Sequence, residues 1–218
     1  YCCFFVVGLP GRFSHRISDH LLEKTIIIHP SVRLPESLRH ADQPSMDIVV
    51  AGNFRDEKNP ALMLDAVRAL KDSTFQFHAY GAGGDFLDML EKTAADYPHF
   101  HFHGVKSHSV VLEKMQSAYL LLNTSTEEGG ANAICEAVSM GMPVGASGIA
   151  GNIGMLGDEY EGIFQSNDLP SVLETLRRCE RELDFYSLLK KQVTKRAPLF
   201  DYEHEKQSWH ALLKSTVR

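Results

Sequence analysis

The feature that most constrains the fold is an alternation of short apolar runs with helix-like patterns, which begins at Asp47. The apolar runs have the length of strands that are buried on both faces. They are Ile48–Ala51, Phe75–Tyr80, Phe100–His103 and Tyr119–Asn123, with a shorter one near Glu161–Phe164. Between them apolar residues recur at helical spacing, as in the segment that starts at Asn59 and Pro60. Repeated units of this kind predict a parallel sheet with helices on both faces.

The loops that follow these strands contain glycine. They carry Gly52, then Gly81, Gly83 and Gly84, then Gly104, then Gly129 and Gly130. In a parallel sheet such loops share one edge, where ligands bind outside the carboxyl ends of the strands. Because glycine lets a backbone approach a ligand closely, we expect a ligand site at this edge. The alternative for each loop alone is that glycine is simply common in tight turns.

We interpret the stretch Leu120–Gly157 as one half of that site. A buried strand leads through a polar loop, with Glu128 before two glycines, into a helix that begins near Asn132. Free N–H groups and the positive end of the dipole at a helix N-terminus favour an anion. A second glycine-rich turn, Gly145–Asn152, follows the next short strand and is expected to approach the same place.

Glu136 is the second acidic residue of this stretch, eight positions after Glu128. On a helix it lies roughly opposite Ile134, so we expect it to point away from the core, toward the strand ends. Two carboxylates flanking an anion cradle are suited to the hydroxyls of a sugar. The alternative is that Glu136 is an ordinary solvated helix residue.

Two cations, Arg55 and Lys58, follow the first strand of this region just before a helix. Cations at the ligand edge can neutralise a diphosphate and stabilise it as a leaving group. The alternative is that both cations are exposed to solvent and balance the charges of Asp56 and Glu57.

Composition excludes several classes of function. A net charge of -6 over 218 residues, without a Lys/Arg cluster, argues against nucleic-acid binding. The four cysteines form no CxxC pair, so neither a disulfide framework nor a metal site is expected, and a cytoplasmic location fits best. His99, His101 and His103 alternate on one strand, and we interpret them as solvent-facing rather than metal ligands. No apolar run is long enough to span a membrane, and no pattern indicates an oligomeric state.

Residues 1–46 precede the regular pattern. They hold an apolar run at Cys2–Val7, a β-branched strand at Thr25–Ile28 and a polar segment at His40–Pro44 that reads as a linker. Residue 1 is Tyr rather than Met, which indicates a processed chain or a fragment. We therefore expect 1–46 to be the remnant of an N-terminal domain with its linker, and 47–218 to be the ligand-binding domain with C-terminal helices.

An ordered series of motifs resembles a known family. Gly52–Lys58, Tyr80–Gly83, Phe102–Val105 and Ser125, followed by two glutamates with seven residues between them, resemble the donor-binding C-terminal domain of GT-B glycosyltransferases of the glycogen-synthase-like family four. The resemblance covers about residues 25–215. It implies the C-terminal half of a GT-B enzyme, with a Rossmann-like parallel sheet, a UDP-sugar as donor substrate, and neither cofactor nor metal.

The resemblance also implies a role for each matching residue. Lys58 matches the lysine at the donor diphosphate, Glu128 the acid near the donor sugar, and Glu136 the acid that binds the ribose hydroxyls. The backbone that surrounds the donor would come from Gly104 and Val105 along the base, and from Gly129, Gly130 and Ala131 beside the sugar. The family usually has arginine directly after the glycine of its first strand, where this chain has Asn53, and Arg55 is the candidate substitute.

Three further motifs are similar to the subgroup known as selenosugar synthases of selenoneine biosynthesis. They are Glu128–Asn132, Gly151–Gly157 and Ala197–Phe200. This similarity implies that selenophosphate is joined to the sugar of the UDP-sugar. Two alternatives stay open: a nucleotide-sugar-binding module without turnover, and a polysaccharide-type family four glycosyltransferase.

Overall fold

The computed structural model describes residues 6–8, 25–35 and 38–216. Its main body is a six-stranded sheet with the strand order β5-β4-β3-β6-β7-β8. The strands are β3 (Ser45–Ala51), β4 (Gln76–Tyr80), β5 (Phe100–Gly104), β6 (Ala118–Asn123), β7 (Val144–Ser147) and β8 (Ile163–Phe164). Every neighbouring pair in this sheet is parallel, which confirms the arrangement predicted from the alternating pattern.

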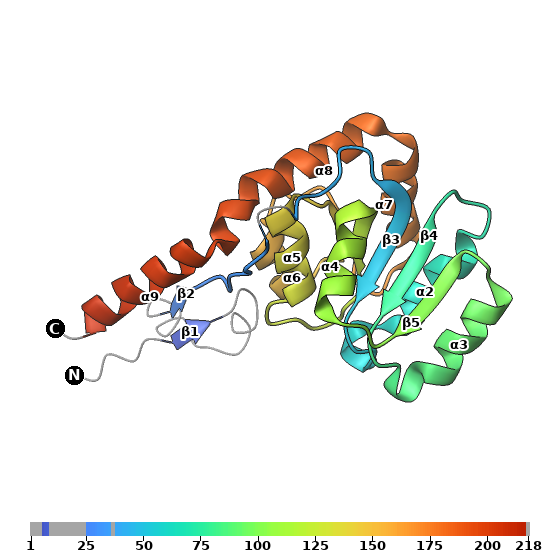
Figure 1. Cartoon of the computed structure of the whole chain (residues 1–218), viewed down its shortest axis with the longest axis horizontal. Coiled ribbons are helices and arrows are strands. Elements are labelled where there is room, and N and C mark those ends of the chain that lie inside the picture. Colours follow the sequence, from blue (N-terminus) through green and yellow to red (C-terminus); the bar gives the residue numbers. More distant parts are fainter. Residues whose placement is uncertain (1–5, 9–24, 36–37, 217–218) are drawn as a thin grey trace.

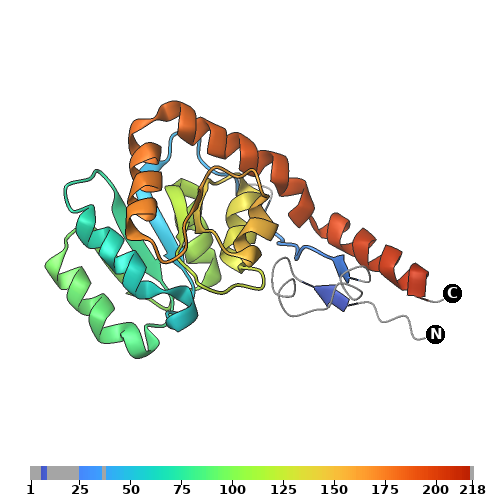
Figure 2. The same cartoon turned by 180° about the vertical axis from the view of Figure 1, so that it is seen from behind.

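Helices cover both faces of the sheet (Figure 1 and Figure 2). One face carries α2 (Pro60–Ala69), α3 (Leu87–Asp96) and α7 (Leu169–Arg181). The other carries α4 (His108–Ser117) and α5 (Asn132–Met140), with α6 (Ala150–Leu156) packed beside α5. The chain then continues through α8 (Leu183–Arg196), which returns to α5, and through the short 3-10 helix η3 (Ala197–Phe200) into α9 (Tyr202–Thr216).

Local sequence signals explain where the helices near the site begin and end. Asn59 adopts a left-handed conformation with φ 48°, and its side chain accepts a hydrogen bond from Leu62 N at 3.4 Å, while Pro60 opens α2. Gly141 ends α5 in the left-handed region, at φ 83°. The core between the layers is apolar, and its largest fully buried side chains include Phe75, Phe77, Phe100, Phe164 and Phe200.

A smaller unit lies away from the sheet. β1 (Val6–Gly8) and β2 (Thr25–Ile27) form a separate parallel pair, and α9 extends beside them (Figure 1). β2 confirms the strand predicted at Thr25–Ile28, whereas most of the apolar run Cys2–Val7 lies outside the described residues. The segment after β2 is bound to the C-terminal helices, since Ser31 N donates to Glu205 Oε2 at 2.9 Å.

The segment interpreted as a linker is attached to the sheet domain where it begins. His40 N donates to Met140 O at 2.9 Å, and the His40 ring bonds through Nε2 to Ala118 O at 2.7 Å. β3 then starts at Ser45, and the division between residues 46 and 47 stays a prediction. In the part of the chain that the structure describes, no helix has both the length and the apolarity needed to cross a membrane.

Candidate functional site

The candidate site lies where the strand order changes direction. From β3 the chain first adds β4 and β5 on one side, and then crosses over to add β6, β7 and β8 on the other. The loops after β3 and β6 therefore leave the sheet side by side at its carboxyl edge, where ligands of such folds bind. η1 (Asp56–Lys58) lies in the first loop, and the second loop leads into α5.

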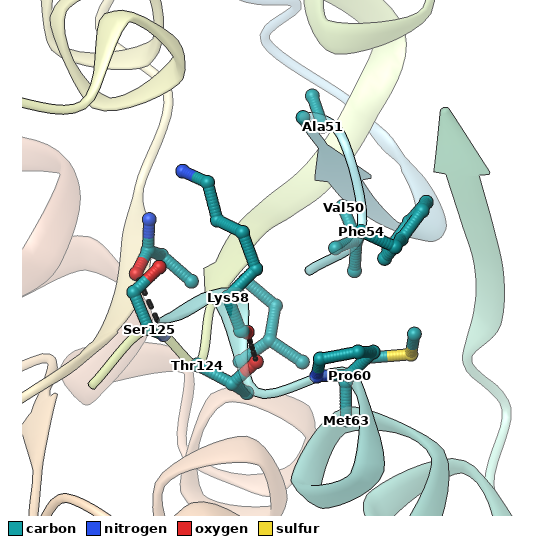
Figure 3. Close-up of a pocket in the computed structure, with 11 residues that line it drawn as sticks. Val50, Ala51, Phe54, Lys58, Pro60, Met63, Thr124 and Ser125 are labelled. Atoms are coloured by element: carbon teal, nitrogen blue, oxygen red, sulfur yellow. Dashed lines mark hydrogen bonds between the residues drawn. The ribbon is translucent and has the colours of Figure 1, made fainter. Parts of the chain in front are cut away.

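Hydrogen bonds join these two loops to each other. Thr124 Oγ1 donates to Lys58 O at 3.0 Å, and Thr126 N donates to Glu57 O at 2.8 Å. A small pocket lies beneath the joined loops, and Figure 3 shows Lys58, Thr124 and Ser125 beside it. The residues that line this pocket are Val50, Ala51, Gly52, Phe54, Lys58, Pro60, Met63, Leu122, Asn123, Thr124 and Ser125.

Lys58 and Glu128 form an ion pair across the two loops. Their side chains are only 21% and 11% exposed, and Ser125 Oγ donates to the same Glu128 oxygen at 2.8 Å. A Cβ on Gly52 would come 3.3 Å from Lys58 Cε, so glycine leaves room for the lysine to lie across the strand end. The structure thus brings together the two residues predicted for the diphosphate and the donor sugar, each neutralising the other.

A buried polar network fixes the loop after β6. Asn123 Oδ1 accepts from Ser125 N at 3.1 Å and from Asn152 Nδ2 at 3.3 Å, while Ser147 Oγ donates to Ser125 O. Because these groups are buried, each bond is strong and its loss would leave an unsatisfied polar group. The loop that carries Glu128 therefore starts from a rigid base.

The end of the predicted glycine-rich turn approaches this loop as expected, whereas its first residues, from Gly145 to Ser147, belong to strand β7 and not to a turn. A Cβ on Gly151 would lie 2.1 Å from Glu128 O, so only glycine allows α6 to pack this closely against the loop. The signal was visible in the sequence as a glycine after a short apolar run.

Glu136 is buried on α5 rather than solvated, so the alternative of an ordinary surface residue is wrong. Its Oε1 accepts a hydrogen bond from His108 Nε2 at 2.8 Å. Burial raises the pKa of Glu136 above its ordinary value, and the hydrogen bond from His108 opposes this shift. His108 was not singled out from the sequence, where only its place at the start of a helix after a glycine loop could have drawn notice.

The remaining predicted residues are placed differently. Arg55 is exposed and pairs with Glu57 at 3.5 Å, which is the solvated arrangement, and it is not brought to Lys58 and Glu128. Asn53, where the family usually has arginine, accepts from Ala82 N at 3.1 Å and so holds the next loop in place. The structure thus does not provide Arg55 with a contact to the site, and its binding role stays a prediction.

Backbone groups predicted around the donor lie at the carboxyl edge. Gly104 ends β5 at φ 63°, followed by the exposed Val105. Gly129 and Gly130 are partly buried and precede Ala131, whose carbonyl accepts from Ile134 N at 2.9 Å in the first turn of α5. The first N–H groups of a helix have no partner within it and can bind an anion.

The prediction of solvent-facing histidines is wrong for His99, which directly precedes β5, and holds only in part for His101 and His103. His99 is buried and donates from Nε2 to Val67 O at 3.0 Å. His101 and His103 are half-buried, and the ring of His78 from β4 stacks on both, with centroids 4.8 and 5.3 Å away. The neighbouring strand supplies partners that the alternation on β5 alone does not reveal. Among the described residues, no three or more His, Cys, Asp or Glu are grouped to hold a metal ion.

A sequence model of the family described as glycosyl transferases group 1 matches residues 45–179, more than half of the chain. The chain belongs to this family. The match begins with β3 and ends in α7, so it includes both loops of the site. A search among curated proteins finds no match.

Solved glycosyltransferase structures share the fold. Sucrose-phosphate synthase from Thermosynechococcus elongatus superposes with a TM-score of 0.73 at 18% identity, over 88% of this chain and 52% of that one. HepE from Anabaena, solved with UDP and glucose, gives 0.73 at 16% identity, over 88% and 57%. A glycosyltransferase from Rickettsia africae gives 0.74 at 15% identity, over 90% and 58%. The likeness confirms the predicted Rossmann-like fold of GT-B glycosyltransferases, and the chain spans little more than half of each of these proteins.

Proposed function

We propose that this domain binds the nucleoside diphosphate of a UDP-sugar and presents the sugar for transfer to an acceptor. The observation that carries the proposal is the Lys58–Glu128 ion pair, which joins the loops after β3 and β6 in front of the N-terminus of α5. A cation, an acid and a helix N-terminus are the groups that a sugar diphosphate requires. The family supports the proposal, as does the similar fold of HepE, which was solved with UDP and glucose.

In this proposal, binding of the donor replaces the ion pair between Lys58 and Glu128 with one between Lys58 and the diphosphate. Lys58 leaves Glu128 for the diphosphate, and the released Glu128 accepts hydrogen bonds from the donor sugar. Gly129, Gly130 and Ala131 supply N–H groups beside it. Glu136 accepts from the ribose hydroxyls. As the acceptor attacks the anomeric carbon, the bond to the diphosphate oxygen breaks and UDP leaves with the electron pair, which Lys58 and the helix dipole stabilise.

The proposed acceptor is selenophosphate, on the basis of the motifs similar to selenosugar synthases. Its selenium would form the bond to the anomeric carbon as UDP departs. The rival proposals are a polysaccharide-type transferase and a binding module without turnover. The test is mass spectrometry of mixtures that contain selenophosphate with UDP-glucose or UDP-GlcNAc. A seleno-linked sugar phosphate forms only if selenophosphate is the acceptor, and neither rival proposal predicts it.

Donor binding is tested by titration calorimetry with UDP and uridine. Lys58→Ala should weaken UDP about tenfold or more and uridine less than about twofold, because only UDP brings phosphate charge to the loop. Lys92→Ala is the matched control, since Lys92 is exposed on α3 away from the site. Equal losses of affinity for both ligands, or an unchanged affinity for UDP, would contradict the proposal that Lys58 binds the diphosphate.

A further inference from the structure

His108 covers the buried carboxylate of Glu136. Its Nε2 lies 2.8 Å from Glu136 Oε1, and the two side chains are 66% and 12% exposed, so the ring lies on the solvent side of the acid. His108 is the first residue of α4, whereas Glu136 lies on α5. The contact therefore links the loop after β5 to the helix that follows β6.

The backbone that carries His108 is firmly placed. α4 buries Leu112 and Met115 against the sheet, and Lys114 on the same helix forms an ion pair with Asp47 of β3. The packing of α4 therefore fixes the backbone position from which the His108 side chain reaches Glu136.

This contact uses only one of the two oxygens of the Glu136 carboxylate. Oε1 accepts from His108, while no residue in the described part of the chain donates to Oε2. An ionised carboxylate accepts at both oxygens, whereas a protonated one donates from one of them and loses acceptor capacity. Burial favours the protonated form, whereas the hydrogen bond that His108 donates to Oε1 favours the ionised form, in which Oε2 is an acceptor only.

We propose that His108 is a positioning residue that holds the carboxyl group of Glu136 in one orientation, so that Oε2 accepts from a ribose hydroxyl of the donor. This inference rests on the proposed function, since it assumes that Glu136 faces the ribose. The consequence is selectivity, because the site then prefers a ribonucleoside diphosphate over the 2′-deoxy form. His108 produces this preference through its hydrogen bond to Glu136, without contacting the sugar itself.

The test compares UDP with 2′-deoxy-UDP by titration calorimetry. Wild type should prefer UDP by about tenfold or more, the worth of one hydrogen bond to a charged group. His108→Ala should weaken UDP about tenfold and 2′-deoxy-UDP less than about twofold, so that the preference disappears. His108→Gln, whose amide can donate to Oε1, should keep most of the preference. His210→Ala, at an exposed position of α9, should behave as wild type.

Each result bears on one idea. Equal weakening of both nucleotides by His108→Ala, or an unchanged preference, overturns the role of His108 even if Glu136→Gln still abolishes the preference. Wild type that binds neither nucleotide overturns the proposed function, and this inference with it.

Discussion

At the scale of single residues, the burial of Glu136 makes the stability of the fold depend on pH. Its carboxylate is buried against one hydrogen-bonding partner, His108, and burial raises its pKa. The folded chain therefore holds the proton more tightly than the unfolded chain does. As pH rises through the interval between the two pKa values, the unfolded state loses its proton first, and the free energy of unfolding falls.

If Glu136 accepts from the ribose as proposed, Glu136→Gln should weaken UDP binding by about 1.5–3 kcal/mol, the worth of a hydrogen bond to a charged group. The same change should leave the Tm near neutral pH unchanged or raised, because the buried charge is removed while an amide oxygen still faces His108. Calorimetric titration and thermal unfolding measure both quantities on one sample. A variant that binds UDP as wild type does would take Glu136 out of the site.

Residue types and spacing singled out Lys58, Glu128 and Glu136, but not the contacts that these side chains make. The ion pair between Lys58 and Glu128 depends on how two loops, far apart in sequence, cross at the strand ends. The cover that His108 gives Glu136 depends on where α4 begins relative to α5. No local pattern encodes either distance. For Arg55 the sequence showed the charge but left open whether the side chain faces the site or the solvent, and the structure places it in the solvent.

At the scale of elements, the glycines of the carboxyl edge have unequal roles. A Cβ on Gly81, at φ 142°, would lie 2.0 Å from Gly52 O. A Cβ on Gly104, at φ 63°, would meet no atom within 4 Å. The first glycine permits two strand ends to touch, while the second only permits a left-handed turn.

Gly81→Ala should lower the free energy of unfolding by more than about 3 kcal/mol, since backbone must move, and Gly104→Ala by about 1–2 kcal/mol, the cost of the left-handed conformation. Urea unfolding of the two variants gives the comparison. Equal losses would show that the contact between the loops after β3 and β4 contributes little.

The period of apolar residues predicted the strands and helices well, because burial on both faces of the sheet dictates that pattern. Asn59 and Pro60 marked the start of α2 within one residue. β8 is shorter than the predicted strand, with only Ile163 and Phe164 paired to β7. His99 was misread because its ring packs under a helix, where a buried imidazole is satisfied by the carbonyl of Val67.

At the scale of the whole molecule, a cluster of imidazoles links stability to pH. Burial, with the positive charge of Lys114, lowers the pKa of His78 to about 4, and Asp47 opposes this shift. The unfolded chain takes up a proton near pH 6.5 that the folded chain refuses until about pH 4. Stability from this group is therefore present above pH 6.5 and lost as pH falls between these values.

We expect the free energy of unfolding to fall by on the order of 3 kcal/mol from His78 alone across that interval. His78→Gln should flatten the dependence of the unfolding free energy on pH, whereas His210→Ala, at an exposed position, should leave it as in wild type. Urea unfolding at several pH values measures the slope. An identical slope in the His78 variant would assign the acid sensitivity to other groups.

In the proposed function, the mutual neutralisation of Lys58 and Glu128 also affects how a nucleotide reaches the site. A free lysine in a cleft projects a field that draws anions from a distance, but a lysine already paired with an acid projects almost none. The chain as a whole carries a net charge of -6, so a dianionic nucleotide approaches against a weak repulsion. Added salt, which screens this repulsion, should therefore raise the association rate of the nucleotide instead of lowering it.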